Sequence, residues 1–135
     1  MSQLNLHNRS TPPLNGRVPI IQRLTDAYKL WHECFQNFPQ KSRYTLGAKI
    51  DNLFLEVLEL TFLASYLNHE QKLPFLRKAG AKLDSLKFFI QLSWEIKIFD
   101  NKKYLALSEQ LTETGRMLGG WIKQTEKINP AKSRE

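Results

Sequence analysis

Cysteine is almost absent from this sequence of 135 residues, since Cys34 is the only one. A lone cysteine excludes an intrachain disulfide and any metal site built from several cysteines, and it is compatible with the reducing cytoplasm. Long apolar runs are missing as well. The most apolar stretch, residues 53–67, is shorter than the roughly 18 residues that a membrane span needs, and two glutamates interrupt it. No apolar run typical of a signal peptide is present near the N-terminus, so the sequence predicts a cytoplasmic protein that does not enter a membrane.

The residue patterns of common bundle enzymes are also missing. None of the three histidines follows a glutamate at the three-residue spacing of a diiron site. The glycine-rich residues 115–120 lack the lysine and the preceding strand of a phosphate-binding loop. Glu56 and Glu59 lie one turn apart, but no third group accompanies them for acid–base chemistry. We therefore expect no catalytic residue, no metal site and no cofactor.

The sequence does contain four stretches of apolar residues at helical spacing, without the alternation typical of strands. Residues 1–19, before the first stretch, are polar and proline-rich and are expected to form a flexible lead. The four stretches span residues 20–128, and residues 129–135 are expected to form a flexible tail. Because the connections are short, we predict an all-α domain, an antiparallel four-helix bundle that runs up, down, up and down.

Local signals predict where the helices begin and end. The first helix is expected to stop before Pro39, and Ser42 is a candidate cap for the second. Pro74 is expected to mark the start of the third helix, since proline suits the first helical turn. Asp100 is a candidate cap for the fourth.

Apolar residues at helical spacing are expected to fill the core from the second helix (Leu46, Ile50, Leu53, Val57, Leu60, Ala64 and Leu67) and from the third (Leu76, Ala79, Leu83, Leu86 and Ile90). Both helices carry a second apolar stripe in addition to this core stripe. On a soluble monomer, a contiguous apolar surface of more than a few hundred Å² is rare and marks an interface. We therefore predict that these helices pair with other copies of the chain in a homo-oligomer, the alternative being scattered exposed side chains. The predicted interface residues are Leu55, Phe62, Tyr66, Phe88, Leu92 and Phe99.

Basic residues outnumber acidic ones by 20 to 13, which gives a net charge of +7 and favours a polyanionic partner. The excess is concentrated in residues 71–99, where six basic side chains accompany two acidic ones. We predict contact with phosphates and no reading of bases, because aromatic and basic residues do not alternate. A solvated face without a partner is the alternative. The predicted nucleic-acid-binding residues are Arg77, Lys78, Lys82, Lys87, Arg116 and Lys123.

The fourth helix keeps three glycines, Gly115, Gly119 and Gly120, in the segment ETGRMLGGWIK. Each glycine inside a helix costs about 1 kcal/mol relative to alanine. Gly115 and Gly119 lie one turn apart, so we expect them to let a neighbouring helix approach closely. Trp121 is expected to supply the large contact that offsets the loss. A phosphate bound by the exposed backbone is the alternative.

Three segments carry a resemblance to a known family. They are FPQKSRYTLGAKIDNLFLEVLE at the opening of the second helix, LPFLRKAGAKLDSLKFFIQL in the third, and ETGRMLGGWIK in the fourth. Over residues 20–125 the chain resembles the accessory variability determinant (Avd) family of diversity-generating retroelements. It is also similar to the wider four-helix-bundle family encoded in intervening sequences of bacterial large-subunit ribosomal RNA genes.

The resemblance to the Avd family implies a homopentameric barrel of four-helix protomers with a positively charged surface. It implies binding to the reverse transcriptase of the retroelement and to RNA or DNA, in support of error-prone copying, by a protein that is not itself a catalyst. The resemblance assigns this binding to helices and not to single family positions. It implies that the basic side chains of the third helix, and Arg116 in the fourth, take part. Two other functions stay open. One is an interaction module of the intervening-sequence type with no retroelement role, and the other is a bundle nuclease that depends on His69 or Glu56.

Overall fold

The computed structural model describes residues 18–128, so the predicted tail and most of the predicted lead lie outside the described residues. The elements along the chain are α1 (Pro19–Gln36), α2 (Gln40–Ser42), the π-helical segment η3 (Arg43–Gly47), α3 (Ala48–Ala64), α4 (His69–Glu95) and α5 (Asn101–Ile128). No strand is present within residues 18–128, and the all-α prediction is confirmed.

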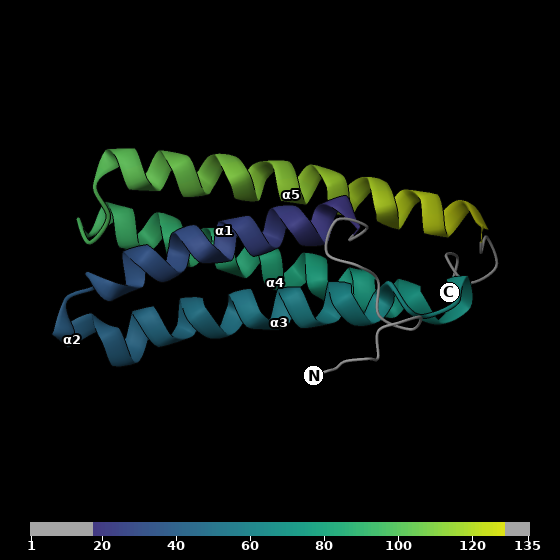
Figure 1. The fold of residues 1–135 in the computed structure, drawn as a ribbon, viewed down its shortest axis with the longest axis horizontal. Coiled ribbons are helices and arrows are strands. Elements are labelled where there is room, and N and C mark those ends of the chain that lie inside the picture. Colours follow the sequence, from purple (N-terminus) through teal and green to yellow (C-terminus); the bar gives the residue numbers. More distant parts are fainter. Residues whose placement is uncertain (1–17, 129–135) are drawn as a thin grey trace, which may run out of the picture.

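The four long helices alternate in direction and lie side by side in a bundle (Figure 1). α1 packs against α3 and α5, and α4 also packs against both of these helices. α1 has 18 residues whereas α4 and α5 have 27 and 28, and the last turns of α5 extend past the start of α1 (Figure 1). The antiparallel bundle predicted from the short connections is therefore confirmed.

The core stripe predicted for α4 is buried, whereas Leu46, Leu60 and Leu67 of the stripe predicted for the second helix are half-buried. In α4, every predicted core position from Leu76 to Ile90 has an exposed fraction of at most 2%. Burying one large apolar side chain contributes roughly 1.5–3 kcal/mol relative to leaving it exposed. The spacing missed Phe54 of α3, which is fully buried with its ring against those of Tyr28 and Trp31. The core thus includes most of the predicted stripes and one further aromatic side chain.

An aromatic cluster fills the end of the bundle where α1 finishes and α5 begins. Trp31 lies at its centre, with the ring of Phe35 stacked at 5.1 Å and those of Phe38 and Phe99 edge-on at 5.4 and 6.0 Å. Phe99 is only 4% exposed, so the prediction that it belongs to an outer interface is wrong. The residue follows the end of α4, where the chain turns back, and helical spacing no longer determines its direction.

The cap predicted at Ser42 is also wrong. The helix has already begun at Gln40, directly after Pro39, and it continues through η3 into α3. In η3, Gly47 lies directly against α1. A Cβ atom at this position would be 2.5 Å from Cε1 of Phe35, so a larger residue would force that ring to move.

The starts of α4 and α5 depend on side-chain caps. α4 begins at His69, well before Pro74, because the Asn68 side chain accepts a hydrogen bond from the Gln71 N–H at 2.9 Å. The cap predicted for α5 is confirmed, since a carboxylate oxygen of Asp100 accepts from the backbone N–H of the third residue after it at 2.8 Å.

Two side chains of α1 bind one carboxylate of α3. The Tyr28 hydroxyl and the Trp31 indole N–H both donate to Oδ1 of Asp51, at 2.8 and 3.0 Å. The pKa of Tyr28 is raised from 10.0 to about 12 by burial first, and then by the hydrogen bond to Asp51 and by its negative charge. Helical spacing carries no signal for this link, because the partners are 23 and 20 residues apart.

Candidate nucleic-acid and partner surfaces

The predicted basic residues of α4 divide between its two flanks. Arg77 pairs with Glu126 of α5, and the two charged atoms are 2.7 Å apart. Lys82 pairs with Glu56 of α3, at 3.5 Å between Nζ and Oε1. One residue therefore faces α5 and the other faces α3. A phosphate backbone that ran straight along α4 would meet only part of the predicted set.

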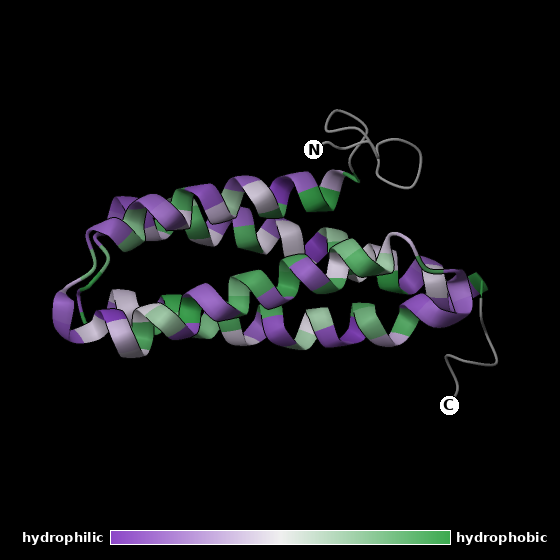
Figure 2. Ribbon diagram, turned by 60° about the horizontal axis from the view of Figure 1, so that its bottom comes forward, coloured by the Kyte–Doolittle hydropathy of each residue, from purple (hydrophilic) through white to green (hydrophobic). Residues whose placement is uncertain are grey.

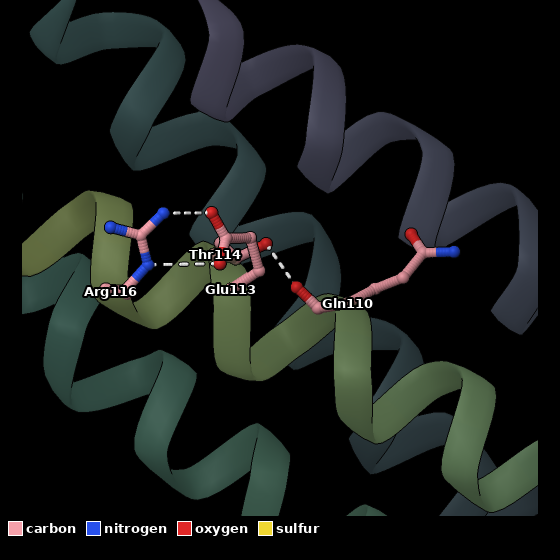
Figure 3. A network of polar contacts seen from close by, with 4 residues as sticks. All are labelled: Gln110, Glu113, Thr114 and Arg116. Carbon is pink, nitrogen blue, oxygen red and sulfur yellow. Dashed lines mark hydrogen bonds and ion pairs between the residues drawn. The ribbon is translucent and has the colours of Figure 1, made fainter.

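Arg116 of α5 is held by Glu113 through two hydrogen bonds (Figure 3). The hydrogen bond from Arg116 lowers the pKa of the Glu113 carboxyl, and the charge of Arg23 on α1 adds to this effect. Thr114 lies beside this pair and turns inward, where its hydroxyl donates to the Gln110 carbonyl at 2.8 Å (Figure 3). The Arg116 side chain is 74% exposed, so a phosphate can reach it in competition with Glu113.

The other three predicted binding residues form no ion pair among the described residues. Lys78 and Lys123 are exposed. Lys87 is half-buried beside α5, with its Nζ 3.9 Å from the position that a Cβ on Gly115 would take. The predicted set thus consists of one half that is paired with glutamates and one half that is not. Its contact with nucleic acid stays a prediction.

The second apolar stripe of α3 is exposed to solvent beside α1. Leu55 is 45% exposed, Phe62 and Tyr66 are each 44% exposed, and the two rings lie edge to face at 5.0 Å. Leu55 and Phe62 also line a shallow hollow with Ile21 of α1. Much of α3 is coloured as hydrophobic in Figure 2. Within residues 18–128 this face stays partly exposed, and its role in an interface stays a prediction.

The outer side of α4 is apolar over a shorter length. Phe88 is 59% exposed, whereas Leu92 is half-buried. Ile96, which directly follows α4, is 54% exposed and was missed by the interface prediction. The signal was present, since the three residues recur at intervals of four. Their role in an interface stays a prediction.

Close packing does not explain the glycines of α5. A Cβ atom on Gly119 or Gly120 would meet nothing within 4 Å, and one on Gly115 would make an ordinary contact with Leu83 at 3.7 Å. Trp121 is half-buried against the core, with the Lys72 ammonium 5.6 Å from the centre of its ring. Within one copy of the chain, the prediction of a close helix approach therefore fails at Gly119 and Gly120, which have open space beside them. The described glycine that does permit a close approach lies in η3.

A hollow of about 750 Å³ lies at the end of the bundle where α4 turns into α5. Cys34 is on its wall, and burial raises the pKa of this thiol, which makes it a poor nucleophile. No three side chains of His, Cys, Asp or Glu within residues 18–128 are grouped so that they could hold a metal ion. None of the described helices is long and apolar enough to cross a membrane.

The fold and these surfaces define a basic four-helix-bundle protein with apolar helix faces exposed to solvent. The chain belongs to the bAvd-like family, because the model of that family matches residues 19–125, which is nearly all of the bundle. The resemblance to Avd proteins that the three sequence segments carry is thereby confirmed. A search of curated proteins finds no match to the chain.

Proposed function

We propose that this protein is the accessory protein of a diversity-generating retroelement. It assembles into a homopentamer and binds both the reverse transcriptase of the element and nucleic acid, either template RNA or complementary DNA. It supports mutagenic retrohoming, while the polymerase supplies the chemistry. The observation that carries the proposal is the match to the bAvd-like family over residues 19–125.

The exposed apolar faces support the homo-oligomer. Each protomer carries one face on α3, around Phe62 and Tyr66, and a different one on α4, around Phe88. Two different faces suit a head-to-tail contact, in which one face of a protomer binds the other face of the next. Contacts of this kind generate a closed ring when the rotation between protomers closes.

The charge of the chain supports nucleic acid as a partner. A net charge of +7 attracts polyanions and makes their binding sensitive to salt. Lys78 and Lys123 are exposed and unpaired among the described residues, so they are the most available of the predicted phosphate contacts.

The oligomer is tested by light scattering behind size exclusion, in high salt that strips bound nucleic acid. Five copies of the 15.8 kDa chain give 5 × 15.8 = 79 kDa. Phe62→Asp is expected to lower this mass, because it places a charge in the proposed contact. Leu105→Asp is the matched control, since Leu105 is 63% exposed on α5 outside both proposed faces. A wild-type mass of 15.8 kDa would overturn the homo-oligomer.

The polymerase partner is tested by coexpression with a tagged reverse transcriptase of the same retroelement. Coelution of the two proteins in high salt, after nuclease treatment, is the expected result. A stable oligomer that never coelutes would favour one of the two other functions kept open above, that of an interaction protein of the intervening-sequence type.

A further inference from the structure

The turn between α4 and α5 closes one end of the bundle, and the hollow of about 750 Å³ opens there. The wall of the hollow includes Trp94 from the last turn of α4, Lys97 from the turn, Lys103 from the start of α5 and Asn37 from the end of α1. α2 lies at the same end of the bundle (Figure 1). Segments that are far apart in the sequence thus meet around one opening.

Lys97 adopts a backbone conformation that favours glycine. Its φ is 69°, and no other non-glycine residue in the described part of the chain has a positive φ. The N–H groups of Lys97 and Ile98 donate to the carbonyls of Trp94 and Ser93, at 2.9 and 2.8 Å, in the Schellman pattern that ends many helices. Glycine is the usual residue at this position because it has no Cβ. Helix stability therefore does not account for a lysine here, which points to a use for its side chain.

Three exposed lysines, Lys97, Lys102 and Lys103, surround this turn, and none of them forms an ion pair with the described residues. By contrast, half of the basic residues predicted on the sides of α4 and α5 are paired with glutamates. A phosphate can approach a free ammonium group without displacing a carboxylate from it. The turn is therefore the better site for contact with a polyanion.

Two acidic side chains, Glu95 and Asp100, also line the hollow. Each is engaged by the chain itself. Oε2 of Glu95 accepts a hydrogen bond from Nε2 of Gln91 at 3.1 Å, and Oδ1 of Asp100 accepts from the backbone N–H of Lys103 at 2.8 Å. On the wall they balance the charges of Lys97 and Lys103, so the positive excess around the turn comes from Lys102, which lies outside the wall.

Trp94 gives the hollow a flat apolar wall. Its indole ring stacks on that of Tyr104 at 4.7 Å, and its Nε1 donates to Oδ1 of Asn101 at 2.7 Å. These contacts hold the half-buried ring in one orientation. An aromatic surface beside lysines is the combination with which proteins bind single strands, since bases stack on the ring while phosphates meet the cations.

We infer that this end of the bundle is a contact surface for single-stranded nucleic acid. Lys97, Lys102 and Lys103 bind successive phosphates, and one base enters the hollow beside Trp94. This inference rests on the nucleic-acid binding in the proposed function, and it places that binding at the α4–α5 turn instead of along the sides of α4 and α5.

The test compares two triple variants of the full chain in binding a fluorescein-labelled uridine homopolymer, followed by anisotropy over a series of salt concentrations. Lys97→Gly/Lys102→Gln/Lys103→Gln removes the turn lysines. Lys29→Gln/Lys49→Gln/Lys127→Gln is the control, because it removes the same charge from exposed lysines of α1, α3 and α5 that form no ion pair among the described residues and belong to no proposed binding set. The turn variant is expected to weaken binding at least about tenfold and to reduce the slope of log affinity against log salt by about 2. The control is expected to change affinity by less than about threefold.

The single variant Lys97→Gly distinguishes a role of the Lys97 side chain in binding phosphate from a role in stabilising the fold. Glycine relieves the left-handed backbone, so the melting temperature should rise while the affinity for the homopolymer falls. Unchanged affinity in a more stable variant would overturn the role of Lys97. Equal losses in both triple variants, or a loss only in the control, would overturn the surface while leaving nucleic-acid binding intact. A wild-type protein that does not bind the homopolymer even in low salt would overturn the nucleic-acid part of the proposed function itself.

Discussion

Two regions of the bundle are rich in aromatic side chains, but they differ in what covers them. In the aromatic cluster at the α1–α5 end, Trp31 is fully buried and Phe99 is 4% exposed. On the outer side of α3, Phe62 and Tyr66 are each 44% exposed, although their rings are as close together as those in the cluster. The protomer completes the first region by itself, whereas the described residues leave the second uncovered. Enclosure by neighbouring helices, and not aromatic content, therefore distinguishes core from candidate interface.

The largest effect is expected from Trp31→Ala in the cluster. The variant leaves a cavity among four rings and removes a hydrogen bond to Asp51, so it should lower the free energy of unfolding by about 3–5 kcal/mol. Urea unfolding at several protein concentrations measures this. The loss should not depend on concentration for Trp31→Ala, whereas a loss caused by Phe62→Ala should, because its contacts are between copies. If Phe62→Ala lowered the free energy of unfolding by the same amount at every protein concentration, Phe62 would belong to the core of one copy and not to an interface between copies.

Gly47→Ala should lower the free energy of unfolding by about 1–3 kcal/mol, because the new methyl group would overlap the ring of Phe35. Thermal unfolding of Gly47→Ala, Phe35→Leu and the double variant measures this. In the double variant the two losses should be less than additive, since the smaller side chain makes room for the methyl group. Strictly additive losses would show that the ring is not what excludes a side chain at Gly47.

A pH dependence is expected from Tyr28 at the edge of the same region. The pKa of Tyr28 is raised in the folded protein to about 12 from 10.0, so the neutral phenol stabilises the fold below pH 10 and this stabilisation is lost as the pH rises toward 12. Tyr28→Phe should be less stable than wild type by about 1 kcal/mol at neutral pH. The difference should shrink as the phenol ionises, and urea unfolding of both proteins across this range measures it. A constant difference would mean that Asp51 does not hold the phenol in its neutral form.

The smallest effect is expected from Gly119→Ala on the open side of α5. No described atom is close enough to clash with the methyl group, so better helix propensity should raise the free energy of unfolding by up to about 1 kcal/mol. Thermal unfolding and light scattering are the two measurements. A stable variant with a reduced mass would instead mean that another copy of the chain comes close at this glycine.

The spacing of apolar residues was sufficient to predict which residues are buried where a helix packs one face against the core. The α4 stripe at Leu83, Leu86 and Ile90 and the cap at Asp100 follow from local spacing, and both are as predicted. Phe99 was misplaced because the left-handed turn before it ends the helical period. Spacing along one helix does not report where a turn redirects the chain.

The candidate surfaces were less predictable because they depend on pairs that are distant in sequence. Arg77 and Glu126 are 49 residues apart, and nothing local indicates that they bind each other. The same holds for Gly47, whose need to be glycine comes from a ring on another helix. Composition predicts how much charge the chain carries, whereas the packing of helices decides which charges stay available.

The carboxylate of Asp51 fixes how α1 and α3 can move relative to one another. Because Tyr28 and Trp31 donate to the same oxygen, α1 cannot slide along α3 or rotate on it without depriving that carboxylate of its donors. The link sets the register of α1 against α3. One carboxylate oxygen thus couples two hydrogen bonds, and a shift of α1 along α3 would break both at once.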